Sequence, residues 1–175
     1  GCKLGTAGRG SHENLPPERT HIGGWSAHAI RRNNDFLRSV DYASIEHLQG
    51  IAFTGTVGDC PPTSDDWHRV LRAFWRRLKR LGVVLIHWVI EWQQRGAPHL
   101  HCSLFWHQLD LSIASAVIRH WLDLTGKWGS GPFGQNLTQI HDSKGWHQYT
   151  SKHAQRGLSH YQRSPENIPA EWLGK

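Results

Sequence analysis

Two strand-like runs joined by a short turn constrain the fold of this chain more than any other feature. Residues 83–93 (VVLIHWVIEWQ) and 99–106 (HLHCSLFW) are rich in β-branched and aromatic side chains, and Gly96 and Pro98 lie between them. Such runs favour strands, and a connection this short joins antiparallel neighbours. The sequence therefore predicts a β-hairpin and, with it, an antiparallel sheet.

The segment from 63 to 81 carries the strongest helix pattern. It opens at a Thr63 or Ser64 cap and stops at Gly82. Its apolar side chains recur at spacings of four and three residues: Trp67, Leu71, Phe74, Leu78 and Leu81. Basic side chains follow the opposite face, where they could track phosphates or lie in solvent: Arg69, Arg72, Arg76 and Arg80.

Further elements alternate along the chain. Strands are predicted over 51–57 and 136–141, and an amphipathic helix over 111–125 turns its apolar residues inward. A last helix begins at 142 or 143 and runs toward 157. The resulting order, β-α-β-β-α-β-α, is typical of an α+β fold in which helices pack on an antiparallel sheet.

The length of 175 residues suits one domain with its own core. Residues 1–20 are rich in Gly, Pro and charge, so we expect a mobile N-terminal arm followed by one domain over 21–175. Residues 25–40 could form a helix with a basic edge. The sequence contains no Met, from which we expect a fragment of a longer protein.

The charge balance favours an acidic partner. The 20 Lys and Arg outnumber the 14 Asp and Glu, and the net charge of +6 suits nucleic acid, although a basic soluble protein fits as well. Three well-separated cysteines exclude a CxxC zinc site and a closed disulfide framework, which predicts a reducing, cytoplasmic compartment. No apolar run reaches the roughly 18 residues of a membrane helix, so we expect no membrane partner.

A metal site is predicted at the hairpin. His99 and His101 are two residues apart and project from one face of a strand, whereas Leu100 and Cys102 project from the other. Glu91, on the preceding strand, can lie opposite the two histidines. Two imidazoles and one carboxylate leave positions open for water or substrate oxygens, unlike a closed structural zinc site.

A tyrosine and a lysine are predicted to share a helix face further along the chain. Tyr149 and Lys152 are three residues apart in WHQYTSKHAQR, with Trp146 and His153 alongside. A lone tyrosine of this kind is more often an ordinary half-buried aromatic residue than a nucleophile.

Three motifs, in this order, resemble those of the HUH endonuclease superfamily: FTGT (Phe53–Thr56), HLH (His99–His101) and YTSK (Tyr149–Lys152). They are similar to the FTxT, HUH and YxxK motifs of rolling-circle replication initiators, and EWQQRGAPHLH is similar to filamentous-phage and plasmid members. The resemblance covers about residues 50–157. Tyr149 has no second tyrosine at helical spacing, as in the single-tyrosine subclass.

The resemblance implies the Rep nuclease fold and a metal-dependent nickase. Glu91, His99 and His101 would hold Mg²⁺ or Mn²⁺, and Tyr149 would attack the scissile phosphate to give a 5′-phosphotyrosine and a free 3′-hydroxyl. Lys152 would either stabilise developing negative charge or position the phosphate. Cleavage and rejoining would be one reversible reaction.

The implied partner is single-stranded DNA at a replication origin, which could form a hairpin. A host polymerase and a host helicase are further candidates, and the implied location is the cytoplasm of a bacterial host. Exposed aromatic rings beside basic residues stack bases. The candidates for DNA contact are Thr54, Thr56, Arg95 and Trp146.

Other functions stay open at this point. A relaxase or transposase of the HUH type performs an identical nick. Two histidines and a carboxylate also form the facial triad of non-haem iron oxygenases. A non-catalytic single-stranded DNA-binding module would use only the basic and aromatic side chains.

Overall fold

A computed structural model of the chain describes residues 27–142, 145–146, 166 and 168–172. The elements are α1 (Ala27–Ser39), α2 (Tyr42–Ile45), β1 (Gln49–Thr56), α3 (Ser64–Arg80), β2 (Leu85–Trp92), β3 (Pro98–Trp106), α4 (Leu111–Thr125), η1 (Gly126–Trp128), η2 (Pro132–Gly134), β4 (Asn136–Ile140) and η5 (Ala170–Trp172). The arm expected over 1–20 lies outside the described residues. So does all but the beginning of the helix expected toward 157.

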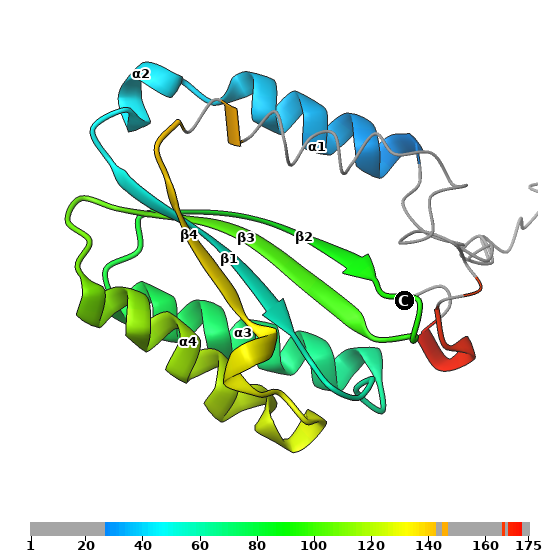
Figure 1. The fold of residues 1–175 in the computed structure, drawn as a ribbon. Helices are drawn as coiled ribbons and strands as arrows, with labels where there is room; N and C mark the ends of the chain where they lie inside the picture. The colour runs from blue at the N-terminus through cyan, green and yellow to red at the C-terminus, as the bar shows by residue number, and fades with distance from the viewer. Residues whose placement is uncertain (1–26, 143–144, 147–165, 167, 173–175) are drawn as a thin grey trace, which may run out of the picture.

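The four strands form one antiparallel sheet in the order β2-β3-β1-β4. Figure 1 shows α1 over one face of this sheet and α3 with α4 over the other. The predicted α+β fold, with helices packed on an antiparallel sheet, is therefore confirmed. The predicted hairpin is β2 and β3, whose register places Glu91 opposite His99.

Side-chain caps begin the two long helices that cover one face. The Asp66 N–H donates to Oγ1 of Thr63 (3.1 Å), and the Ile113 N–H donates to Oδ1 of Asp110 (2.8 Å). These bonds satisfy backbone donors that a helix N-terminus leaves unpaired. In the described part of the chain, no helix has the length and apolar character needed to cross a membrane.

The end of α3 shortens the strand that follows it. Gly82 has a φ of 81°, and its N–H donates to the carbonyl of Lys79 (3.0 Å), while the N–H of Val83 donates to that of Leu78 (3.2 Å). This is the Schellman pattern of helix termination, which favours glycine. Because the turn uses Val83, β2 begins at Leu85 rather than at the predicted residue 83.

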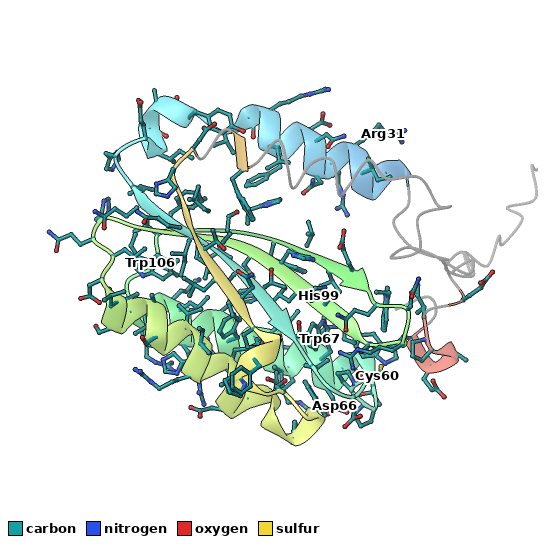
Figure 2. The ribbon with its side chains drawn as sticks, in the orientation of Figure 1. Arg31, Cys60, Asp66, Trp67, His99 and Trp106 are labelled. Carbon is teal, nitrogen blue, oxygen red and sulfur yellow. The ribbon has the colours of Figure 1, made fainter. Side chains whose placement is uncertain are left out.

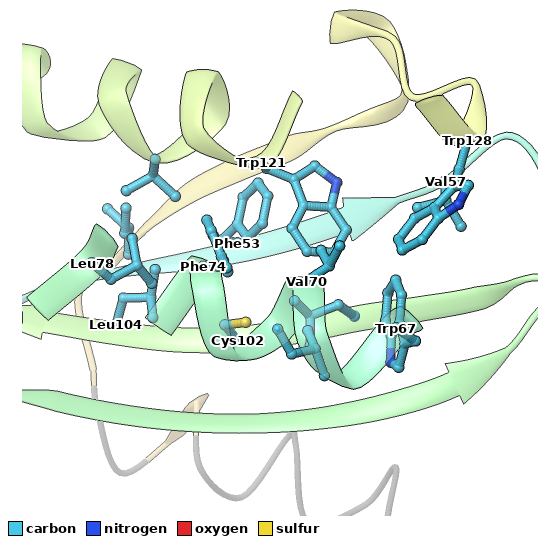
Figure 3. Packing of buried hydrophobic residues seen from close by; sticks show 14 of the residues in the cluster. Phe53, Val57, Trp67, Val70, Phe74, Leu78, Cys102, Leu104, Trp121 and Trp128 are labelled. Atoms are coloured by element: carbon cyan, nitrogen blue, oxygen red, sulfur yellow. The ribbon is translucent and has the colours of Figure 1, made fainter. Parts of the chain in front are cut away.

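An aromatic core lies between the sheet and the helices α3 and α4 (Figure 3). The ring of Trp121 contacts those of Phe53, Trp67 and Phe74, with centroids 5.2 to 5.8 Å apart. Gly55 of β1 leaves room for Trp121, since a Cβ there would lie 2.8 Å from its ring. The predicted inward faces of both helices are confirmed by the burial of Trp67, Leu71, Phe74, Leu78, Val117 and Trp121.

Helix α1 packs on the opposite face of the sheet and contacts it near the start of β2. Nε2 of His87 in β2 lies 3.0 Å from Oδ1 of Asn33, and the His87 ring stacks on Phe36 with centroids 5.8 Å apart. His99 and His101 lie nearer the other end of this face and are partly exposed. The two histidines therefore lie on the same face of the sheet as His87, which α1 contacts.

Candidate active site

Three side chains of the β2–β3 hairpin converge on the face of the sheet away from α3. Glu91 lies opposite His99, and its Oε2 atom is 3.3 Å from Nε2 of His101. The rings of the two histidines have centroids 4.5 Å apart. Figure 2 labels His99 on the sheet and Trp67, which belongs to α3. The structure thus brings together the three residues that the sequence analysis grouped, and their role as metal ligands stays a prediction.

Burial affects the protonation of His99, one of these side chains. The Glu91 side chain is 1% exposed and that of His101 is 20% exposed. Burial lowers the pKa of His99 to about 4, and the lowering effects of His101 and Arg95 add to it against the raising effect of Glu91. The His99 ring is therefore neutral at neutral pH. A neutral imidazole keeps the nitrogen lone pair that a metal ion binds.

The donor set fits a divalent cation by its chemistry. Imidazole nitrogens and a carboxylate bind such ions, and three protein ligands leave positions open for water or a substrate oxygen. In residues 27–142 and the shorter described segments, no group of three or more His, Cys, Asp or Glu side chains is already arranged to hold a metal ion. In the structure, Oε2 of Glu91 and Nε2 of His101 instead contact each other at 3.3 Å.

The FTGT segment of β1 lies beside the two histidines. In the β1–β3 register Thr54 is opposite His101, and Thr56 is opposite His99. Oγ1 of Thr54 lies 3.3 Å from Nδ1 of His101. The two ring nitrogens of His101 therefore face different partners, Thr54 on β1 and Glu91 on β2.

A glutamine side chain fastens the end of β1. Oε1 of Gln135 accepts from the N–H of Thr56 (2.8 Å), and its Nε2 donates to the Thr56 carbonyl (3.1 Å). The hydroxyl of Ser130 donates to the same carbonyl (3.0 Å). Gln135 and Ser130 lie in the glycine-rich segment GKWGSGPFGQ and belong to none of the motifs, so the sequence did not identify them. Together they hold the strand neighbour of His99 in place.

Arg95 reaches from the β2–β3 turn to the end of β1. Its guanidinium group donates to the carbonyls of Val57 and Gly58, and its Nε donates to Oε1 of Gln93 (2.9 Å). These bonds tie the turn to the end of β1. The contact between Arg95 and DNA stays a prediction, and in the structure its donors face protein carbonyls.

Trp146 lies near the edge strand β4 rather than at the hairpin. It lines a cavity of about 430 Å³ together with Thr138, His141 and their neighbours. The N–H of Trp146 donates to the carbonyl of Asp142 (2.9 Å), a helical spacing. Tyr149 and Lys152 follow outside the described residues, so their position relative to the histidines stays a prediction.

The basic stripe of α3 lies on the other side of the sheet from the histidines. Its four arginines are exposed, and Arg69 pairs with Asp66 at 3.1 Å. Because α3 covers the face occupied by Leu100 and Cys102, the sheet separates the stripe from His99 and His101.

The sequence matches known replication proteins. The family model of the replication-associated protein ORF2 matches residues 51–158. A replication-associated protein of Pseudomonas phage Pf3 is 52% identical over 90% of this chain and 57% of its own length. Two proteins with provisional names as replication proteins, from Xylella fastidiosa strains 9a5c and Temecula1, are each 43% identical over 94% and 93% of this chain.

The chain is shorter than these relatives. It spans 57% of the phage protein and 56% and 60% of the two Xylella fastidiosa proteins. No solved structure matches the chain.

Proposed function

Because the chain belongs to the replication-associated protein ORF2 family, we propose that it initiates replication by nicking and rejoining single-stranded DNA. The observation that carries the proposal is the meeting of Glu91, His99 and His101 on one face of the sheet. A site with these donors and open positions suits chemistry on a phosphate oxygen.

The three side chains would hold a Mg²⁺ or Mn²⁺ ion, which supplies electrophilic stabilisation of negative charge on the scissile phosphate. Their positions are set by paired strands, and Gln135 and Ser130 brace the neighbouring strand end. Groups held in this way need little rearrangement when charge develops in the transition state, which is the condition for effective electrostatic stabilisation.

Tyr149 is the proposed nucleophile. Its hydroxyl oxygen forms a bond to phosphorus as the bond from phosphorus to the 3′ oxygen breaks. The tyrosine hydroxyl loses its proton, and the leaving 3′ oxygen gains one. The products are a 5′-phosphotyrosine and a free 3′-hydroxyl. Because the phosphodiester is exchanged rather than hydrolysed, attack by a 3′-hydroxyl reverses the reaction and rejoins the strand.

Lys152 is proposed to assist the attack by Tyr149. At three residues from Tyr149 in a helix-forming sequence, its ammonium group would stabilise charge on the attacking oxygen or position the phosphate. A tyrosine has an ordinary pKa of about 10, so it needs such activation or orientation near neutral pH.

The proposed substrate is single-stranded DNA at a replication origin, with a hairpin as one form. The net charge of +6 favours a polyanion, and Thr54, Thr56, Arg95 and Trp146 remain the proposed contacts. The free 3′-hydroxyl would serve a host polymerase, and a host helicase would open the duplex.

Membership of a replication family favours this function over a non-haem iron oxygenase. A relaxase or transposase would share the nick and differ in its DNA substrate. A non-catalytic single-stranded DNA-binding module is the alternative that experiment must separate.

Cleavage of a labelled, randomised single-stranded DNA library tests the proposal. We expect cleavage in Mn²⁺ or Mg²⁺, its loss in EDTA and its return when the metal is restored. Sequencing the DNA that stays covalently attached would identify the preferred site. Binding without cleavage in either metal would contradict the proposal and favour the non-catalytic module.

A further inference from the structure

We infer that Thr54 is a positioning residue that fixes the ring of His101, so that Nε2 of this histidine faces the metal position. The inference rests on the proposed function, because it assigns Thr54 to the same site. It differs from the DNA contact expected of Thr54, since the hydroxyl acts here on a protein side chain.

The His101 ring lies between two strands that each contact one of its nitrogens. Toward β2, Nε2 is 3.3 Å from Oε2 of Glu91, and toward β1, Nδ1 is 3.3 Å from Oγ1 of Thr54. Thr54 and His101 are register partners, so strand pairing determines the distance between their backbones. Both side chains are partly buried, which reduces competition from water for the ring nitrogens.

A hydroxyl suits this position better than a group that only accepts hydrogen bonds. A neutral imidazole has one N–H and one lone pair, whereas a hydroxyl both donates and accepts. When Nε2 binds a cation, Nδ1 carries the hydrogen and donates it to the Thr54 oxygen. When the N–H is at Nε2 and faces Glu91, the Thr54 hydroxyl donates to Nδ1. Thr54 therefore holds the same ring orientation in both tautomers.

Thr138 provides a matched control on the same face of the sheet. It lies on β4 opposite Ala52, two residues from Thr54 along β1. Its hydroxyl donates to Oδ1 of Asn136 (3.0 Å) rather than to a histidine. Replacing Thr138 by valine makes the same chemical change as Thr54→Val without affecting His101.

Mn²⁺ affinity in the absence of DNA, measured by electron paramagnetic resonance, tests the inference. Thr54→Val removes the hydroxyl and keeps the branched shape, so we expect affinity to fall on the order of 10- to 100-fold, as for other groups that orient a ligand. Thr54→Ser restores the hydroxyl and should bind nearly as the unmodified chain does. Thr138→Val should bind as the unmodified chain does.

Nitrogen-15 chemical shifts of the His101 ring in the metal-free chain give a second readout that does not depend on a cation. We expect the Nδ1 signal to move in Thr54→Val and to return in Thr54→Ser. If Thr54 had only a structural role, Thr54→Val would change the urea midpoint and would leave both the Mn²⁺ affinity and the Nδ1 signal of His101 unchanged.

The outcomes distinguish this inference from the proposed function. If Thr54→Val binds Mn²⁺ as tightly as the unmodified chain while His101→Ala has lost binding, the role of Thr54 is wrong and the metal site stands. The metal site is wrong if the unmodified chain does not bind Mn²⁺, or if Glu91→Ala binds it equally well. The role of Thr54 is then wrong as well.

Discussion

Oε2 of Glu91 lies 3.3 Å from Nε2 of His101, although the strand register pairs Glu91 with His99. The contact is diagonal across the hairpin, a separation that long side chains bridge on the face of an antiparallel pair. One buried carboxylate therefore adjoins two imidazoles. We expect the three side chains to act as one group, so that loss of any of them disables the site.

Removal of a single proposed ligand should abolish nicking. We expect His99→Ala, His101→Ala and Glu91→Gln each to slow cleavage on the order of 100-fold or more, because the scissile phosphate loses preorganised charge stabilisation. DNA binding should change much less. Single-turnover cleavage of a selected oligonucleotide measures the rates.

His107→Ala is the matched control for the ligand variants. His107 is exposed and follows the last residue of β3, at the far end from His99. It should cleave at the unmodified rate. Full nicking by any of the three ligand variants at low Mn²⁺ would overturn the metal assignment.

The basic stripe of α3 should not contribute to binding of the nicked strand. It lies across the sheet from the histidines, so we expect Arg72→Gln with Arg76→Gln to leave the salt dependence of single-stranded DNA binding unchanged. If both arginines contacted phosphates, the log-log slope would become shallower by about 1.4, at about 0.7 for each contact. Fluorescence anisotropy over a salt series measures the slope.

Arg95→Lys should weaken the tie between the β2–β3 turn and the end of β1. Lysine keeps the charge but cannot reproduce the forked bonds to Val57 and Gly58. We expect the free energy of unfolding to fall by about 1 kcal/mol. Urea unfolding measures this, with the exposed Arg31→Lys as a control that should have no effect. Equal free energies of unfolding for the two variants would show that the hydrogen bonds of Arg95 do not stabilise the fold.

Gly55→Ala should disturb the packing of Trp121. The added Cβ would lie 2.8 Å from the indole ring, and we expect a destabilisation of about 1 to 3 kcal/mol from overpacking. Gly131→Ala is the control, because a Cβ there meets nothing within 4 Å. Equal urea midpoints for the two variants would refute the close approach of Trp121 to β1.

Local patterns predicted most of the fold. Apolar spacing and Gly82 indicated α3, and the short turn indicated the hairpin, because helix periodicity and strand alternation are properties of neighbouring residues. The family resemblance, drawn from FTGT, HLH and YTSK, is confirmed by the match to residues 51–158. The proximity of Glu91 to the histidines followed from the hairpin alone.

Contacts between distant segments could not be predicted in this way. The bond from Gln135 to Thr56 spans 79 positions and depends on the pairing of β4 with β1. The bonds from Arg95 to Val57 and Gly58 likewise require the turn and the end of β1 to meet. The pairing of Thr54 with His101 needs the register of β1 on β3, which no motif spacing supplies.

The proposed mechanism requires that DNA become covalently attached to Tyr149. The chain is incubated with a labelled single-stranded oligonucleotide selected from the library, and the product is run on a gel after boiling in SDS. Tyr149→Phe keeps the aromatic ring and removes the attacking oxygen, so noncovalent binding should persist while the boiling-resistant complex disappears.

Tyr42→Phe and Tyr161→Phe serve as controls and should form the complex normally, with mass spectrometry placing the nucleotide on Tyr149. A boiling-resistant complex formed by Tyr149→Phe, or a nucleotide found on another residue, would contradict the proposed mechanism.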